Sequence, residues 1–510
     1  MPFQLILFAV STVLVPLYLL HRLRRPSSPS YPPGPPKDPI IGHLRYMPST
    51  NRAMVFREWA KTFGDVIYLD VLGKPMIVLN TEQVAIELLN KRSSIYSDRP
   101  RFVLYEMIGW STTLSLMSYG KQFSTHRQLH HSYLNRNKCR EFRPMQTLEA
   151  YSLVNNLLNC PPKQYNNMIN RFSTGVISQI VAGHKIEGDD DLYMQTTQAL
   201  RDSLGRSGVP GSTALDFFPI LRYLPSWFPG IPYSSIAKEC RPRLQQLYDF
   251  PLQAVQSQLA SRESGSAKPS FLRTYLEKIR QTPEPHNHDD IKWAAAGMFG
   301  STIWSSVTVF VLAMLLHPEY QVKAQAEIDC VVGKTRLPCF EDREDMPLLD
   351  CMMQETLRWH PPTELGVPHR LVEDDVYKGM FIPKGTTVFP NIRAMSLDES
   401  VYSSPEVFYP ERFLPKPMGR GEPAFASLYG FGRRICSGQH LADQSLWIAI
   451  ASILATCTIS NAIDENGNPI IPEHSMSDGV SSHPNDFPCV ISARKENIRQ
   501  LVEEALADSQ

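Results

Sequence analysis

The sequence "YGFGRRICSG" (residues 429–438) places one cysteine, Cys436, two residues after a pair of arginines and among three glycines. Positive charge, exposed backbone amides and a following helix N-terminus each lower the pKa of a thiol, and the thiolate is the form that binds metals. The segment that starts at Gly438, "GQHLADQSLWIAIASIL", has the apolar spacing of a helix beginning directly behind the sulfur. Cys436 is therefore the first candidate for a functional residue.

Three interpretations of Cys436 fit this chemistry: a thiolate ligand of a haem or metal, a redox-active or nucleophilic cysteine, and a buried structural cysteine. The glycines at 430, 432 and 438 allow sharp turns and the close approach of a flat ligand. They do not form a dinucleotide-binding GxGxxG motif, because Ile435 stands at the third glycine position. A phosphate-binding loop is therefore not expected here.

Composition is that of a globular protein and excludes several classes of function. Hydrophobic residues make up 43% and charged residues 20% of the 510 positions, which is enough apolar side chain for a large buried core. Lysine plus arginine and aspartate plus glutamate both number 51, so the net charge is zero and nucleic acid is not an expected partner. The nine cysteines lack CxxC or zinc-like spacing, so we expect free thiols in a reducing compartment.

The N-terminus has the pattern of a membrane anchor. Residues 2–20 carry no charge and, as a helix rising ~1.5 Å per residue, nearly span a ~30 Å hydrocarbon core. Arg22, Arg24 and Arg25 follow, and positive flanks stay on the cytosolic side. The prolines that come next favour a stiff, extended spacer. The sequence predicts a transmembrane signal anchor that contacts membrane lipid (residues 1–21), a basic, proline-rich spacer (22–40) and a cytosolic catalytic domain (41–510).

The rest of the chain is predicted to be mainly α with a small β region. Helix-like apolar spacing dominates, while strand-like segments such as residues 65–80 are short and few. The apolar stretch 291–317 stops at Pro318, and its serines and threonines favour one long buried helix over a second membrane span. Residues 216–232 interleave aromatic residues with prolines, which fits a packed loop or an apolar patch that dips into the bilayer.

Two further motifs precede the cysteine stretch: "ETLR" at residues 355–358 and "PERF" at residues 410–413. Together with "FGRRICSG", in this order and spacing, they resemble the cytochrome P-450 family of haem-thiolate monooxygenases, and the chain looks like fungal microsomal members. The resemblance runs from the anchor to the C-terminus. It implies the cytochrome P-450 fold, with haem b between the long central helix and the cysteine-loop helix and with Cys436 as the ligand of the iron.

The resemblance also assigns roles to charged residues outside the cysteine loop. Glu355 and Arg358 are three apart on a predicted helix and therefore share a face. In the family the arginine of the "PERF" segment, here Arg412, joins them, so we expect a buried structural triad without a catalytic role.

The haem propionates need cationic or hydrogen-bonding partners. By position in the family pattern these are Arg434, Arg127 and His369. Phe123 stands where the family usually has a tryptophan, and a phenylalanine cannot donate the hydrogen bond that an indole supplies. The neighbouring histidines 126, 130 and 131 have no matching carboxylate or cysteine set for a metal, so we expect solvated helix histidines.

In the family, the central helix carries the groups that handle oxygen, and the matching stretch here is "MFGST", residues 298–302. Thr302 matches the threonine that hydrogen-bonds dioxygen and guides protons to it. Ser301 stands where an acid is usual, and a serine passes a proton but does not supply one at neutral pH. Phe299 stands where glycine is usual, so we expect it to narrow a substrate pocket that it shares with Gly300.

The resemblance implies a single-pass protein of the endoplasmic reticulum membrane with its catalytic domain in the cytosol. It would insert one atom of O2 into an apolar small organic substrate, of secondary-metabolic or xenobiotic type, with electrons from NADPH through an NADPH-cytochrome reductase. The changes at Ser301 and Phe299 leave a second hypothesis, a haem-thiolate isomerase, dehydratase or peroxide-using enzyme. A third is a haem-binding protein without catalysis.

Overall fold

The computed structural model describes residues 29–207, 213–225, 227–228, 232–260, 268–281, 287–300 and 302–508. The predicted anchor, residues 1–21, the first part of the spacer and Ser301 lie outside the described residues. Within the described ranges, no single helix combines the length and the apolar composition of a membrane span, whereas α15 (Ile303–Leu316) and α16 (Pro318–Val331), bent by 107° at their junction, meet both criteria only as a pair.

The largest sheet joins segments that are far apart in the sequence. Strands β1 (Val66–Val71) and β2 (Lys74–Leu79) form an antiparallel hairpin, and β2 pairs in parallel with β6 (Thr387–Pro390). Strand β3 (His369–Arg370) closes the order β1-β2-β6-β3, with His369 opposite Val388. The hairpin turns at Leu72 and Gly73, both with positive φ (52° and 79°), as two-residue hairpin loops require. This sheet therefore carries His369 at its edge. Two smaller pairs are β4 (Asp375–Tyr377) with β5 (Met380–Ile382), and β7 (Cys457–Asn461) with β8 (Cys489–Ala493).

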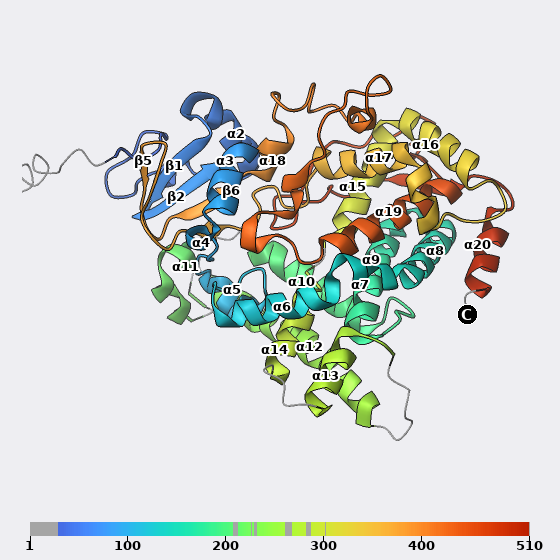
Figure 1. The fold of residues 1–510 in the computed structure, drawn as a ribbon, viewed down its shortest axis with the longest axis horizontal. Helices are drawn as coiled ribbons and strands as arrows, with labels where there is room; N and C mark the ends of the chain where they lie inside the picture. The colour runs from blue at the N-terminus through green and yellow to red at the C-terminus, as the bar shows by residue number, and fades with distance from the viewer. Residues whose placement is uncertain are drawn as a thin grey trace, which may run out of the picture.

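Helices make up most of the remainder, as the apolar spacing predicts. Figure 1 shows the four-stranded sheet at one end of the molecule with a few helices beside it, and most of the helices toward the other end. Their bounds are α2 Arg52–Phe63, α3 Glu82–Ala85, α4 Ser93–Tyr96, α5 Val103–Ile108, α6 Lys121–Leu134, α7 Arg136–Glu141, α8 Arg143–Asn159, α9 Tyr165–Ala182, α10 Leu192–Ser207, α11 Ala214–Phe217, α12 Tyr233–Ala260, α13 Phe271–Gln281, α14 His288–Gly297, α15 Ile303–Leu316, α16 Pro318–Val331, α17 Pro347–Trp359, α18 Ile392–Ser396, α19 Gln439–Thr456 and α20 Ile498–Ala507.

The core is built around α15 and α19, which pack on each other in the middle of the helical part (Figure 1). Both helices are apolar on nearly all faces, and nearly all of their residues are buried, which is the pattern of helices enclosed by other helices. Helices α8, α9 and α17 surround them. Because α19 follows directly on the cysteine loop, this packing fixes the position of the loop against the core.

The prediction of one unbroken helix over residues 291–317 is wrong. The stretch forms α14, which ends at Gly297, and α15, which begins at Ile303. The last turn before the break tightens, since Met298 and Phe299 donate to the carbonyls three residues back rather than four. Glycines at 297 and 300 weaken helical preference, which explains why the break falls here. The end before Pro318 is where the sequence places it.

Candidate active site

The cysteine loop is a tight turn held by its own backbone. The N–H of Cys436 donates to the carbonyl of Tyr429 (2.8 Å), and Gly430 and Gly432 adopt positive φ (79° and 54°). A Cβ atom on Gly432 would lie 2.2 Å from the carbonyl oxygen of Leu89, so this glycine lets the loop pack on the π-helical turn Ile86–Lys91. Gly430 and Gly432 therefore allow the turn of the cysteine loop, and Gly432 also allows the loop to pack against the backbone at Leu89.

The sulfur of Cys436 faces an internal cavity of about 320 Å³. The cysteine is accessible because it opens into this cavity, and the atoms packed around it raise the pKa of its thiol by burial. The backbone amide of Gly438 and the charge of Arg127 act in the opposite direction without reversing the shift. The sequence predicts a lowered pKa, and the structure corrects this because desolvation of the thiolate outweighs the nearby dipoles and charge.

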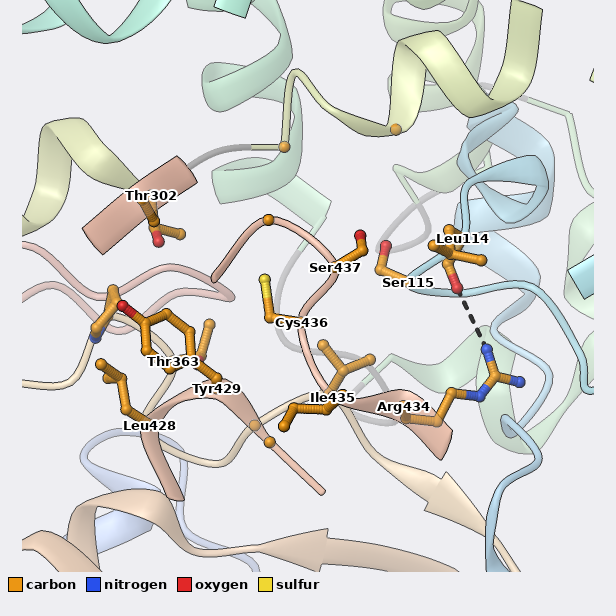
Figure 2. Close-up of a pocket in the computed structure, with 18 of the residues that line it drawn as sticks. Leu114, Ser115, Thr302, Thr363, Leu428, Tyr429, Arg434, Ile435, Cys436 and Ser437 are labelled. Atoms are coloured by element: carbon orange, nitrogen blue, oxygen red, sulfur yellow. Dashed lines mark hydrogen bonds between the residues drawn. The ribbon is translucent and has the colours of Figure 1, made fainter. Parts of the chain in front are cut away.

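Basic side chains line the same cavity, and hydrogen bonds to backbone carbonyls hold them in place. Arg434 donates from Nε to Ser97 (2.7 Å), from Nη1 to Leu114 (3.2 Å, dashed in Figure 2) and from Nη2 to Met117 (2.8 Å). Arg127 donates to the carbonyl of Ile435.

His369 lies on the same cavity, with Nδ1 2.8 Å from the carbonyl of Tyr96. The structure therefore brings together the three basic residues that the resemblance names.

A fourth basic residue, Arg99, lies on this cavity and is not predicted from the sequence. Its Nε donates to Ser115 (2.8 Å), and its Nη1 donates to the carbonyls of residues 367 and 368. Arg99 is 4% exposed, whereas the side chain of Arg101, two positions later, is 58% exposed. No local pattern distinguishes the two arginines, since only the fold decides which one is enclosed.

The basic cluster has the electrostatic signature of a site for an anion. Burial, and then the neighbouring Arg434, hold the pKa of Arg99 well below its usual range, and burial lowers the pKa of Arg434 to about 10. Burial also holds the pKa of His369 well below its usual range. Asp98 offsets part of the charge, but it also pairs with Arg370 (2.8 Å). Because buried cations need a counter-charge, the cluster fits the two propionates of a haem whose iron lies at the Cys436 sulfur.

Phe123 contributes a contact that the sequence does not predict. Its ring lies under the guanidinium of Arg434, with Cζ 3.8 Å from the ring centroid. A phenylalanine cannot donate a hydrogen bond, but this cation–π geometry holds the planar fork of the arginine in place. Phe123 is thus placed to orient Arg434 rather than to contact a propionate through a polar atom.

Two of the histidines on α6 are buried, which corrects the prediction of solvated side chains. His126 is 0% and His130 is 3% exposed, because this face of α6 packs on α14. Nε2 of His126 lies 3.1 Å from Asp290. His130 lines the cavity and contacts both Ser437 and Ala294. His131, the next residue along the helix, is exposed.

The Glu355, Arg358 and Arg412 side chains meet in one buried cluster, each 0% exposed. Arg358 grips the carboxylate with two hydrogen bonds (2.7 and 2.8 Å), and Arg412 donates a third (3.0 Å). Arg412 also pairs with Glu422 (2.6 Å), which lies upstream of the cysteine loop. The cluster therefore ties α17 to the segment that leads into the loop.

The residues of the α14–α15 break divide into two groups. Thr302 and Gly300 line the cavity, and Figure 2 shows Thr302 on the same cavity as the Cys436 sulfur. Phe299 is not among the lining residues, because its ring stacks on Tyr193 with centroids 5.7 Å apart. The expectation that Phe299 narrows the pocket is therefore corrected: the break turns this ring into the core.

Comparison with known proteins gives a consistent result. A family model described as "Cytochrome P450" matches residues 32–487. Cytochrome P450 monooxygenase 176 of Postia placenta is 35% identical over 480 residues, covering 92% of both chains. Cytochrome P450 monooxygenase claR of Ampulloclitocybe clavipes is 35% identical over 475 residues, covering 91% of this chain and 86% of its own. A zebra fish cytochrome P450 solved with abiraterone shares the fold, with a TM-score of 0.71 at 23% identity, covering 87% of this chain and 100% of its own.

Proposed function

The chain belongs to the cytochrome P450 family and is an oxidoreductase of the monooxygenase type, and we propose that it binds haem b through Cys436 and inserts one atom of O2 into an apolar small organic molecule. The observation that carries the proposal is a single cavity in which the Cys436 sulfur, Thr302, three arginines and His369 converge. When bound, the haem iron supplies the activation of dioxygen.

The residues of the chain hold the cofactor from two directions. Cys436 binds the iron as a thiolate, which the Gly438 amide and the charge of Arg127 favour. Arg99, Arg127, Arg434 and His369 would bind the haem propionates. Because each of these four side chains already donates a hydrogen bond to a backbone carbonyl, little side-chain freedom remains to be lost on binding.

Proton delivery rests on Thr302 and Ser301. The Thr302 hydroxyl lies on the cavity and both accepts and donates a proton, while its carbonyl accepts from the N–H of Ser306 (3.1 Å). No aspartate or glutamate occurs among the described residues that line the cavity. This observation favours a second candidate function, a haem-thiolate isomerase, dehydratase or peroxide-using enzyme, because such reactions need no acid beside the threonine.

The substrate is proposed to be apolar because most of the side chains that line the cavity outside the basic cluster are hydrocarbon. Hydroxyl groups on the cavity, among them those of Thr302 and Thr363, would orient a substrate that has one or two oxygen atoms. We propose a secondary-metabolic or xenobiotic compound. Apolar lining is contributed by Leu114, Ile303, Pro362, Val367 and Ile392.

Exposed apolar side chains support the proposed attachment to the endoplasmic reticulum membrane. Trp227 is 78% and Ile40 is 95% exposed, and Phe218, Ile220 and Tyr223 add apolar surface beside Trp227. Lys74 of β2 donates to the carbonyl of residue 216 and lies over the ring of residue 217, so the sheet adjoins this aromatic segment. Exposed aromatic and aliphatic side chains of this kind favour the lipid interface. The proposed electron source is NADPH through a partner reductase.

Reconstitution with an NADPH-dependent reductase and heavy-isotope dioxygen tests the reaction. We expect one labelled oxygen atom in the product and a red-shifted absorption band of the reduced carbon monoxide complex. Cys436→Ala should abolish the band, whereas Cys330→Ala, which removes an exposed thiol, should not change it. Unlabelled product, or turnover only with peroxide, would overturn the monooxygenase proposal in favour of the second candidate.

A separate substitution tests the proton relay. Ser301→Asp restores an acid next to Thr302, and we expect a larger fraction of the consumed NADPH to appear as product. If that fraction does not change, the absence of an acid at position 301 does not limit proton delivery.

A further inference from the structure

His130 connects the cysteine loop to the helix on the other side of the cavity. The residue comes from α6 and is 3% exposed. Its Nδ1 lies 2.8 Å from Oγ of Ser437, the residue directly after Cys436, and its Nε2 lies 2.8 Å from the carbonyl of Ala294 in α14. One imidazole ring therefore has a hydrogen-bond partner on each of its two nitrogen atoms.

The two partners determine where the protons lie. A backbone carbonyl only accepts hydrogen bonds, so Nε2 of His130 carries the proton and donates to Ala294. In the neutral ring, Nδ1 then has a lone pair and accepts from the hydroxyl of Ser437. Burial lowers the pKa of His130 to about 4, in agreement with a neutral ring. The one hydroxyl proton of Ser437 is thus directed at His130.

The direction of the Ser437 hydroxyl proton matters because the preceding residue is Cys436, whose sulfur is the proposed haem ligand. Ser437 and Cys436 are consecutive and both line the cavity (Figure 2). Without an acceptor at His130, the neighbouring sulfur is an available acceptor for the Ser437 hydroxyl. A hydrogen bond to a ligating sulfur withdraws electron density and raises the reduction potential of the metal that it binds.

We propose that His130 is a positioning residue that holds the Ser437 hydroxyl away from the Cys436 sulfur and so maintains the electron donation of the thiolate. The inference rests on the proposed role of Cys436 as the haem ligand. The frame for it is rigid: His126 and His130 are four residues apart on α6 and contact Asp290 and Ala294, which are four apart on α14.

The alternative is that His130 only fills space, since its ring also packs edge-on against Phe271, with centroids 6.3 Å apart. The two roles differ in one respect. A packing role does not depend on the hydroxyl of Ser437, whereas the positioning role acts only through it. A double-mutant cycle between the two residues therefore separates them.

The experiment measures the reduction potential of the haem-loaded full-length protein in four forms: wild type, His130→Phe, Ser437→Ala and the double variant. His130→Phe keeps a ring but removes the acceptor, and we expect the equilibrium to shift about tenfold toward the reduced iron, which is about 59 mV for one electron. Ser437→Ala should leave the potential near that of the wild type. The double variant should return to the wild-type value, because no hydroxyl remains to reach the sulfur.

Two controls and three outcomes complete the test. His131→Ala, an exposed histidine on the same helix, should not change the potential. His130→Gln keeps an acceptor and is expected to stay near the wild-type potential. If the phenylalanine variant does not retain haem, His130→Leu, which also lacks an acceptor, replaces it in the comparison. A His130→Phe protein with full haem and an unchanged potential overturns the proposal, as does a shift that persists in the double variant. A shift with His130→Gln as large as a tenfold change overturns it as well.

The result is distinguishable from failure of the proposed function. If the wild-type protein lacks the red-shifted carbon monoxide band, Cys436 is not the haem ligand and the proposed function fails. If the band is present and the potential does not respond to His130, only the positioning role fails.

Discussion

Removal of the Glu355 carboxylate should destabilise the protein more than any exposed charge change. Glu355 accepts four hydrogen bonds: two from Arg358, one from Arg412 and one from the backbone N–H of Tyr409. Glu422 pairs with Arg412, so among the described residues Glu355 is the carboxylate that faces Arg358. Glu355→Ala therefore leaves Arg358 buried with only carbonyl partners.

The size of the effect follows from this arrangement. Breaking a buried ion pair by removing one partner costs about 3–5 kcal/mol, because the remaining charge is enclosed without compensation. Domains are stable by only about 5–15 kcal/mol, so the variant should lose about a fifth or more of its stability. Glu355→Gln keeps the size of the side chain but turns an acceptor into a donor that faces a guanidinium, so we expect nearly the same loss.

The change in the free energy of unfolding is measured by urea denaturation. Tryptophan fluorescence and the amount of haem that the protein retains monitor the transition. Glu58→Ala is a matched control, since Glu58 and Lys61 form a pair with the same spacing of three residues on α2 but at the surface. We expect no shift of its denaturation midpoint. The reasoning would be refuted if Glu355→Ala lost less than about 1 kcal/mol, or if Glu355→Gln were neutral while Glu355→Ala was not, because the loss would then reflect an empty space rather than a charge.

Further predictions concern stability, haem affinity and lipid contact. Burial raises the pKa of Glu149 to about 7 from the ordinary 4.5, so the stabilising contribution of its protonated form is present below pH 4.5 and is lost as the pH rises to 7. Glu149→Gln should therefore gain up to about 3 kcal/mol over the wild type in urea denaturation at pH 9 and nothing at pH 4; an equal gain at both pH values would contradict this. Phe123→Leu removes the ring face beneath Arg434 and should weaken haem binding about tenfold in a haem-transfer assay, whereas Phe123→Trp should keep the affinity. Brominated lipids should quench the fluorescence of Trp227 in vesicle-bound protein, and Trp227→Phe should remove that quenching; unchanged quenching would place this surface away from the lipid.

The cysteine loop and the two shorter motifs could be predicted because their information is local. "YGFGRRICSG" specifies a turn through its glycines and offers a candidate ligand in its one cysteine, and both depend on residues within ten positions. The same holds for the pairing of Glu355 with Arg358 on one helix face and for the stop at Pro318. The membership of the family and the mainly helical fold followed from such patterns, and the comparisons confirm both.

The site beyond these motifs is a product of long-range packing. Arg99 and Arg101 lie two positions apart, and no local sequence pattern indicates which of them is buried. Arg99 is buried and Arg101 is exposed because the fold encloses only Arg99. His369 reaches the site because β3 closes a sheet in which β2 pairs with β6, more than three hundred positions later in the chain. Its side chain then contacts the carbonyl of Tyr96, which is also distant in the sequence. No pattern in the sequence indicates that His130 is buried, because its burial and its contact with Ala294 depend on the packing of α14.

The segment predicted as the central helix shows both what local sequence patterns determine and what only long-range packing determines. Its apolar residues and its terminating proline are visible in the sequence, and they indicate a buried helical segment. The break after Gly297 and the rotation of Phe299 toward Tyr193 depend on which neighbours occupy the space around the chain. A local pattern determines which conformations a segment can adopt, whereas the direction of each side chain follows from the partners that fill the core, and those partners are set by the whole fold.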